Sequence, residues 1–191
     1  MIPFRRFRER RRRESLAHAL YSSIIVQSRL PEFFHTLAVP DTLDGRFDLI
    51  VLHAFLVMHR LKQAGKRGDE VEARELSQTL FDMMFADMDQ NLREMGVGDM
   101  SIGKKIKQMA RAFYGRVSAY EEGLAAGDEA LASALVRNLY GTLETPVDTR
   151  ITMAVAAYLR HQAATLAGQD DEAVLEGRVS FASLEVASHA Q

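Results

Sequence analysis

The chain has no cysteine among its 191 residues. Disulfide bonds, thiolate metal sites and cysteine nucleophiles are therefore excluded, and the composition is compatible with a reducing cytoplasm. The sequence also lacks the GxSxG motif of serine hydrolases, the HExxH motif of zinc enzymes and the GxxxxGK[ST] phosphate loop. We therefore expect a protein that is not an enzyme and that carries no metal and no cofactor. We also expect no contact with DNA.

Long apolar runs are missing as well. No segment reaches the about 18 to 20 apolar residues that a membrane-spanning helix needs. The arginines near the N-terminus are not followed by the apolar core of a secretory signal, and the later segment SSIIVQSRL is too short and too polar for that role. We expect the protein to stay in the cytoplasm.

The composition is that of an ordinary globular domain, with 47% hydrophobic and 26% charged residues. Apolar residues recur at helical spacing in one segment after another, and period-two alternation is confined to the short tail RVSFASLEV. The sequence predicts an all-α fold, a single-domain helical bundle of about six to eight helices.

Prolines, glycines and capping aspartates divide the chain into the expected helices. We place them at about residues 8–29, 32–36, 47–64, 69–95, 101–127, 128–140 and 148–167, with a last turn in DDEAVLEG. The helix at 47–64 is apolar nearly all round, which is typical of a helix at the centre of a bundle.

The charge is unevenly distributed. Residues 1–14 hold seven arginines against two glutamates, a balance of +5, so the rest of the chain carries −7 of the total of −2. We interpret residues 1–14 as a flexible basic head and residues 15–191 as one helical domain. The arginines and phenylalanines of the head are typical of a peripheral contact with an anionic membrane surface or with RNA phosphates. The alternative is a disordered solubilising tail. The candidate membrane contacts are Phe4, Arg5, Arg6, Phe7, Arg8, Arg10, Arg11, Arg12 and Arg13.

Two groups of potential metal ligands have the wrong spacing. His53 and His59 are six residues apart, about 240° around a helix, and cannot face one ion, so we expect core or boundary histidines. Four carboxylates lie close together in the sequence, at Asp87, Asp89, Glu94 and Asp99. On a helix, however, the side chains of Asp87 and Asp89 point in directions about 200° apart. We expect these to form a solvated face or intramolecular ion pairs.

Methionine and phenylalanine gather on the helix expected at 69–95. Such a stripe could adapt to an apolar client, but it is more typical of core packing, which we expect here; its residues are Phe81, Met83, Met84, Phe85, Met88 and Met95. A rival hypothesis is a small enzyme or anion-binding protein that uses the helix start at Gly103, Lys104 and Lys105 together with Asp99.

Three segments carry a family resemblance: LAVPDTLDGRFDLIVLHAFLVMHRL, LFDMMFADMDQNLREMGVGDMSIGKKIKQMARAFYGR and VSAYEEGL. Together, over roughly Phe33 to Leu124, they resemble the ubiquinol–cytochrome c chaperone family. The resemblance implies a non-catalytic assembly factor for the cytochrome bc1 complex, respiratory complex III, which binds newly made cytochrome b and protects it before assembly.

The family pattern also implies a set of functional residues. It falls on Asp41, Thr42, Asp44, Gly45, Arg46, Asp48, His53, Asp87, Asp89, Arg93, Glu94, Gly96, Gly98, Asp99, Gly103, Lys104, Phe113, Tyr114, Gly115 and Arg116. The partner-binding candidates among them are Asp41, Asp44, Arg46, Asp89, Arg93, Glu94, Gly96, Gly98, Asp99, Gly103, Lys104, Phe113, Tyr114 and Arg116. We expect a mixed apolar and charged groove built from the LREMGVGD corner and the AFYGR helix.

The resemblance also bears on other partners. Mitochondrial members of the family carry a targeting extension and work with a small partner subunit at the ribosome exit. Because this chain opens directly on its arginine-rich head, we expect a bacterial member that acts alone, and a contact with the ribosome stays open.

Overall fold

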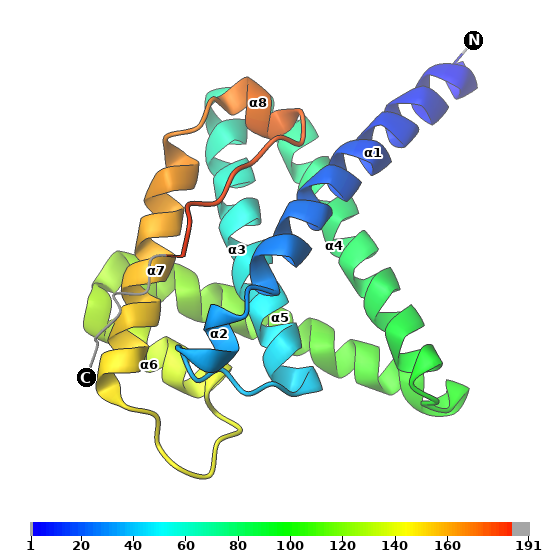
Figure 1. The fold of residues 1–191 in the computed structure, drawn as a ribbon. Coiled ribbons are helices and arrows are strands. Elements are labelled where there is room, and N and C mark those ends of the chain that lie inside the picture. Colours follow the sequence, from blue (N-terminus) through cyan, green and yellow to red (C-terminus); the bar gives the residue numbers. More distant parts are fainter. Residues whose placement is uncertain (1, 185–191) are drawn as a thin grey trace.

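The computed structural model describes residues 2–184, with side chains from residue 6 onward, and within that range the fold is all-α (Figure 1). Eight helices follow one another: α1 (Ile2–Ser28), α2 (Glu32–His35), α3 (Leu43–Arg67), α4 (Glu70–Glu94), α5 (Asp99–Ala126), α6 (Asp128–Leu139), α7 (Thr149–Ala167) and α8 (Asp171–Leu175). The predicted fold class is confirmed. The tail that shows period-two alternation forms no strand in the part of the chain that is described.

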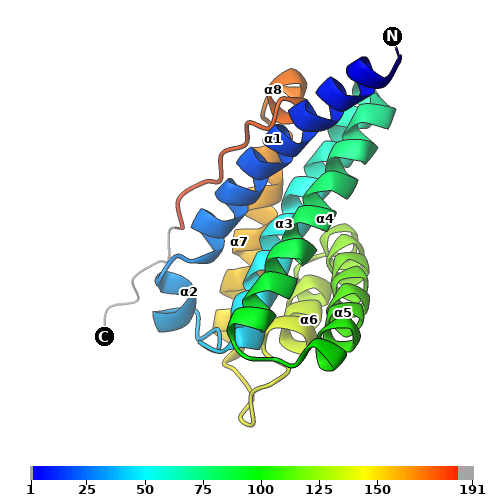
Figure 2. The same ribbon diagram turned by 90° about the vertical axis from the view of Figure 1, so that its right-hand side faces the viewer.

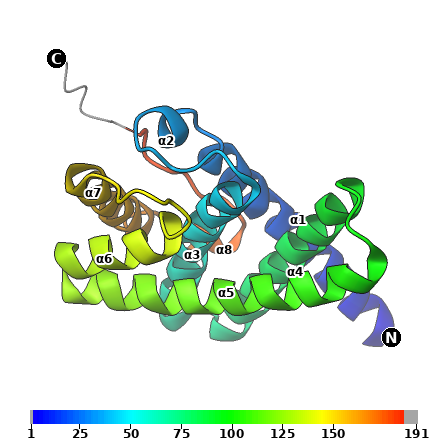
Figure 3. The same ribbon diagram turned by 90° about the horizontal axis from the view of Figure 1, so that it is seen from below.

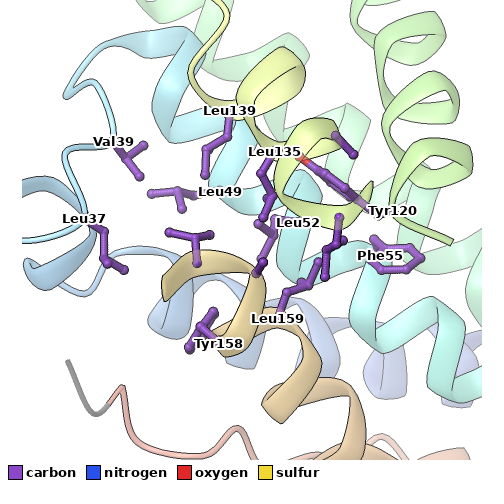
Figure 4. Packing of buried hydrophobic residues seen from close by; sticks show 14 of the residues in the cluster. Leu37, Val39, Leu49, Leu52, Phe55, Tyr120, Leu135, Leu139, Tyr158 and Leu159 are labelled. Atoms are coloured by element: carbon purple, nitrogen blue, oxygen red, sulfur yellow. The ribbon is translucent and has the colours of Figure 1, made fainter. Parts of the chain in front are cut away.

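Helix α3 occupies the centre, as the sequence predicts. It contacts α1, α4, α5, α6, α7 and α8, and it is buried over most of its length. One hydrophobic cluster joins it to α2, α6, α7 and the end of α5 (Figure 4), and a second joins it to α1, α4 and the rest of α5. Helices α1, α3, α4 and α7 run lengthwise beside one another, whereas α5 runs crosswise to α3 and α4 along one side (Figures 2 and 3).

Side-chain caps fix where several helices begin. Thr42 accepts a hydrogen bond from the Gly45 amide at 3.1 Å, so α3 begins at Leu43, four residues before the expected start. Gly45 lies so close to Pro40 that a Cβ atom would stand 2.0 Å from the proline carbonyl oxygen, and only glycine fits. Asp69 caps α4 as predicted, by accepting from the Glu72 amide at 2.9 Å.

The basic head is continuous with the first helix. Helix α1 begins at Ile2 rather than near residue 8, and its N-terminal part projects beyond the other helices (Figure 1). Arg13 ties the end of the head to α4, through Glu72 at 3.0 Å and Glu75 at 2.5 Å. The expected boundary at residue 14 therefore falls inside a helix, and the flexibility of the head stays a prediction.

A buried arginine attaches the end of α7 and the start of α8 to α3. Arg60 donates to the carbonyl oxygens of Leu166 at 2.7 Å and Gln169 at 2.5 Å, and to the Asp171 carboxylate at 2.6 Å. Arg67 binds the same carboxylate, and the two guanidinium groups hold the pKa of Asp171 far below its usual range. These bonds fix α8 and the end of α7 on the central helix.

Candidate functional site

The residues of the family pattern separate into a buried group and an exposed group. The buried group includes Asp48, His53 and Phe113, each of which packs inside the bundle. The exposed group lies at the start of α3, in the turn between α4 and α5, and along the outer side of α5. The first group supports the surface that the second group forms.

Arg116 holds α5 against its neighbours. Its Nη2 atom lies 2.7 Å from Oδ1 of Asp48 on α3, and its Nε donates to the Asn138 carbonyl on α6 at 3.4 Å. Burial raises the pKa of Asp48 to about 7, and Arg116 opposes that shift. The buried Tyr120 hydroxyl has its pKa raised by burial and by the Asp48 charge.

Phe113 packs beside Phe81 and Phe85 in the core. Both family-pattern residues, Phe113 and Arg116, therefore position α5 from inside.

His53 is a core histidine, as the spacing predicts. Its Nδ1 lies 2.7 Å from the Leu49 carbonyl oxygen, which only accepts, so Nδ1 carries the proton and donates. The Nε2 atom then accepts from the Tyr158 hydroxyl at 2.8 Å. Burial lowers the pKa of His53 to about 4, because no negative charge compensates for desolvation of the cation. His59 is a boundary residue, half-buried beside Glu121 at 3.6 Å.

A tight turn with an ion-pair clamp joins α4 to α5. Gly96 adopts φ +79°, a left-handed conformation that favours glycine, and its amide donates to the Arg93 carbonyl at 3.0 Å. The Arg93 side chain bridges the turn, since it binds Asp89 on α4 at 2.6 Å and Asp99 on α5 at 2.6 Å. These carboxylates raise the pKa of the Arg93 guanidinium. The Asp99 charge also lies at the positive end of α5.

The clustered carboxylates form intramolecular contacts, as expected. Asp89 and Asp99 share Arg93, Asp87 accepts from the Tyr21 hydroxyl at 2.7 Å, and Glu94 accepts from Gln90 at 2.9 Å. The methionine stripe is largely core, again as expected: Met84 and Met88 are buried, whereas Met95 at the end of α4 is exposed.

The outer side of α5 is a basic face with exposed apolar residues, which we call the α5 face. Steps of three and four residues align its midline, formed by Met100, Lys104, Lys107, Arg111 and Tyr114. Met100 is fully exposed and Tyr114 is 58% exposed, although its ring stacks on Phe81 at 5.4 Å. Gly103 and Gly115 lie on the same face in open space. Among residues 2–184, no helix covers α5 on this side (Figure 3).

The cations of the α5 face are available to a partner. Lys104, Lys107 and Arg111, together with the neighbouring Lys105, are exposed, and none of them forms an ion pair with the described residues. In contrast, several other basic side chains are paired with carboxylates, namely Arg46, Arg60, Lys62, Arg67, Arg93 and Arg116. The sequence analysis singled out Lys104 and Lys105 but missed Met100, although its position four residues before Lys104 was a usable signal.

One expectation about this region needs correction. Helix α5 begins at Asp99, so Gly103, Lys104 and Lys105 lie one turn inside the helix and are not the helix start that the anion-binding hypothesis needs. At the corner the candidate residues lie on an exposed helix face, and the expected groove stays a prediction. A pocket lies elsewhere in the described structure, between the end of α7, α8 and residues 178–181.

The start of α3 presents a smaller charged group. Arg46 binds Asp41 at 2.6 Å and lies over the Phe34 ring at 5.5 Å, and Asp44 is exposed in the first turn. This group and the α4–α5 turn lie at the same end of the molecule (Figures 1 and 2). The structure therefore places the exposed candidates at one end and along one side.

Comparison with known proteins decides the family. The model of the ubiquinol-cytochrome C chaperone family matches residues 35–181. The chain belongs to this family. The match confirms the resemblance seen in the sequence and extends it through α6, α7 and α8 to Phe181.

Members of the chaperone family with similar sequences or structures come from bacteria and animals. The crystal structure of the Cbp3 homolog from Brucella abortus has a TM-score of 0.80 and 34% identity, over 96% of this chain and 98% of that one. Ubiquinol-cytochrome-c reductase complex assembly factor 1 is 28% identical in Xenopus laevis over 82% of this chain and 74% of that protein. The human protein of that name is 29% identical over 86% of this chain. The chain spans only about half the length, 53%, of the human relative.

The pH dependence of stability tests whether His53 is buried in its neutral form. Between pH 6.5 and 4 the unfolded chain protonates His53 while the folded chain does not, so its contribution to the free energy of unfolding decreases as the pH falls through that window. We predict that the stability difference between wild type and His53→Gln shrinks over this window, by at most about 1.4 kcal/mol per pH unit. Urea unfolding at several pH values measures it.

The control for this measurement is His161→Gln, which replaces an exposed histidine on α7 and should keep the wild-type pH dependence. A constant difference between wild type and His53→Gln from pH 7 to 4 would contradict the buried neutral state of His53.

Proposed function

We propose that this chain is an assembly factor for ubiquinol–cytochrome c reductase that binds newly made cytochrome b before the complex is assembled. The observation that carries the proposal is the family match over residues 35–181, which includes the whole of α5. The relatives from Xenopus laevis and human are named as assembly factors of that complex. The role is binding without catalysis.

The α5 face has the chemistry that such a client requires. Cytochrome b is a polytopic membrane protein, and its helices are apolar before they find their partners. The unbranched side chains of Met95 and Met100 adapt to irregular apolar surfaces, and Tyr114 offers a large ring with a polar tip. Lys104, Lys107 and Arg111 are placed to meet the polar ends of a client helix, which fixes its orientation.

The α4–α5 turn completes this surface. Arg93 is held between two carboxylates, so it keeps one orientation, and the exposed Met95 follows it two residues later in the chain. Gly98 has extended backbone dihedrals and open space where a side chain would be, which lets a partner approach the backbone closely. We therefore assign the turn and the α5 face to the client.

Three substitutions test this surface. We predict that Lys104→Glu, Arg93→Glu and Gly98→Leu each lower cytochrome b accumulation and complex III activity in cells while the protein stays folded. Lys104 is the most informative of the three positions, because it forms no ion pair with the described residues that charge reversal would disturb. Its expected cost in stability is at most about 0.5 kcal/mol, as for other surface positions.

Arg74→Glu provides the matched control, because it reverses an exposed arginine on α4 at the other end of that helix. It should leave cytochrome b levels unchanged. Normal complex III levels in all three folded variants would remove the turn and the α5 face from the client site.

We also propose that the protein is peripheral at the cytoplasmic side of the inner membrane and that the basic head makes the contact. Among residues 2–184, no helix has both the length and the apolar character to cross a bilayer. In the head, Phe7 is half exposed with Arg11 lying over its ring at 4.6 Å, and Arg6 and Arg8 are exposed. An aromatic ring among arginines suits the headgroup region of an anionic leaflet. The side chains of Phe4 and Arg5 lie outside the described residues.

Charge reversal in the head tests the membrane contact. We predict that Arg6→Glu, Arg8→Glu and Arg11→Glu together weaken binding to vesicles containing anionic lipid, by about fivefold for each arginine at low salt. Thermal stability should stay close to that of wild type, because Arg13 and its ion pairs to α4 are kept. Vesicle co-sedimentation measures the effect. Binding by wild type that does not respond to salt would contradict electrostatic attachment.

A further inference from the structure

Helix α5 carries charge of one sign over most of its length. Between Asp99 and Glu121 it holds five basic residues and no acidic one, although the chain as a whole has a net charge of −2. One of the five, Arg116, pairs with Asp48 inside the bundle. The other four are exposed and form no ion pair with the described residues, namely Lys104, Lys105, Lys107 and Arg111. The positive charge on this side of the molecule is therefore left for a partner to neutralise.

The basic side continues from α5 onto the end of α3. Lys62 donates to Glu121 of α5 at 2.8 Å, which places this edge of α3 beside α5. Lys66 follows one turn later on the same edge, where it is exposed and forms no ion pair with the described residues. The end of α3 and the N-terminal part of α1 lie at the same end of the molecule (Figure 1). These lysines extend the basic side from α5 toward that end.

The basic head projects toward the side on which the α5 face lies. Seen from the side and from below, the N-terminal part of α1 extends in the direction that the outer side of α5 faces (Figures 2 and 3). In the head, the exposed Arg6 and Arg8 flank Phe7 in the sequence, and Arg11 lies over its ring. The two basic groups belong to different helices, so they share a side only because of how α1 and α5 cross the bundle. One flat partner can therefore contact both.

We propose that the α5 face lies against the anionic leaflet of a lipid bilayer together with the basic head, so that α5 runs along the membrane surface. The proposal rests on the membrane contact proposed above for the head and adds a second contact, which fixes how the molecule is oriented. Lysine and arginine attract anionic headgroups, and their long side chains keep the charge among the headgroups while the stems cover apolar surface. Met100 and Tyr114 lie exposed among these cations, and tyrosine favours the headgroup region.

The shape of the face favours a bilayer over a nucleic acid, which would offer the same phosphate chemistry. The midline of the face continues from Met100 to Ser118, about five turns or about 27 Å along a straight helix. Single-stranded nucleic acid binds in basic grooves with aromatic rings on which bases stack, whereas this face is the outer side of one helix and its exposed ring, Tyr114, already stacks on Phe81. A flat leaflet can contact the whole length of α5 and the head at once, and two attachments on one rigid body strengthen each other.

The client assigned to the same face is compatible with this arrangement. Cytochrome b is a membrane protein, so the polar ends of its helices lie at the depth of the headgroups. A face held at that depth meets both the leaflet and the helix ends of the client. The two proposals are tested apart, because lipid vesicles contain no cytochrome b.

The absence of cysteine allows a fluorophore to be attached at one introduced cysteine in the full-length chain. Met100→Cys and Ser118→Cys report on the two ends of the α5 face, and Phe7→Cys reports on the head. Ala154→Cys is the control, since it is exposed on α7, which α6 separates from α5 (Figure 3). With vesicles of phosphatidylglycerol and brominated phosphatidylcholine, we expect quenching of the fluorescence at positions 7, 100 and 118 and no change at position 154.

Charge reversal on the face gives the second measurement. Lys107→Glu combined with Arg111→Glu should weaken binding to these vesicles by about fivefold for each substitution at low salt, while the head is unchanged. Arg29→Glu combined with Arg150→Glu makes the same change of charge at exposed positions on α1 and α7 and should bind nearly as tightly as wild type. Circular dichroism shows which variants are folded, and vesicles of phosphatidylcholine alone measure binding without anionic lipid.

Quenching at position 7 with none at positions 100 and 118 would overturn this proposal and leave the head contact standing. Unchanged affinity of the folded variant with Lys107→Glu and Arg111→Glu would overturn it as well. So would binding of polyuridylate by a chain that does not bind the vesicles, because the cations would then belong to a nucleic acid. No quenching at any of the positions would reject both membrane contacts. Each of these results leaves the client assignment to the measurements of cytochrome b in cells.

Discussion

Helix α3 is buried along most of its length, and the polar side chains that it carries into the interior require partners from the surrounding helices. Asp48 is paired with Arg116 of α5, His53 bonds to Tyr158 of α7, and Arg60 binds the end of α7 and the start of α8. A buried charge without a partner costs several kcal/mol, roughly 3 to 5 when one member of a pair is removed. Each of these contacts therefore fixes where one surrounding helix lies.

The candidate surface depends on this arrangement. Because Arg116 and Phe113 hold the inner side of α5, the residues on its outer side share one direction and face away from the bundle. The contact between His53 and Tyr158 has a similar role on the opposite side, since it forms the floor on which Phe181 rests. The α5 face and the packing of residues 178–184 against α7 thus both depend on polar side chains of the same central helix.

Much of the fold could be predicted from the sequence, because helical periodicity and capping residues are local signals. Helix α4, with its Asp69 cap, was predicted closely, and the central position of α3 followed from apolar residues on all its sides. Helix starts were less reliable: α1 includes the basic head, because its Arg13 finds Glu72 and Glu75 on α4, a contact that no local pattern shows.

The candidate surface was predictable only in part. Phe113 and Tyr114 are neighbours in the family pattern, yet one lies in the core and the other on the surface, and that distinction depends on how α5 packs. The packing of residues 178–184 was not predictable for a similar reason. Their alternation indicated a strand, but they bond to the side chains of Gln162 on α7 and Gln169 in the loop after it, and sequence alone gives no rule for such a pairing.

The central claim is that the α5 face contacts cytochrome b, and site-specific photocrosslinking in cells tests it most directly. A photoreactive residue in place of the fully exposed Met100 should yield a crosslinked product that contains cytochrome b. The same residue in place of Val26, which is 69% exposed on α1, should not. Crosslinks to cytochrome b from Val26 but not from Met100, or from neither position while complex III still assembles, would contradict the account.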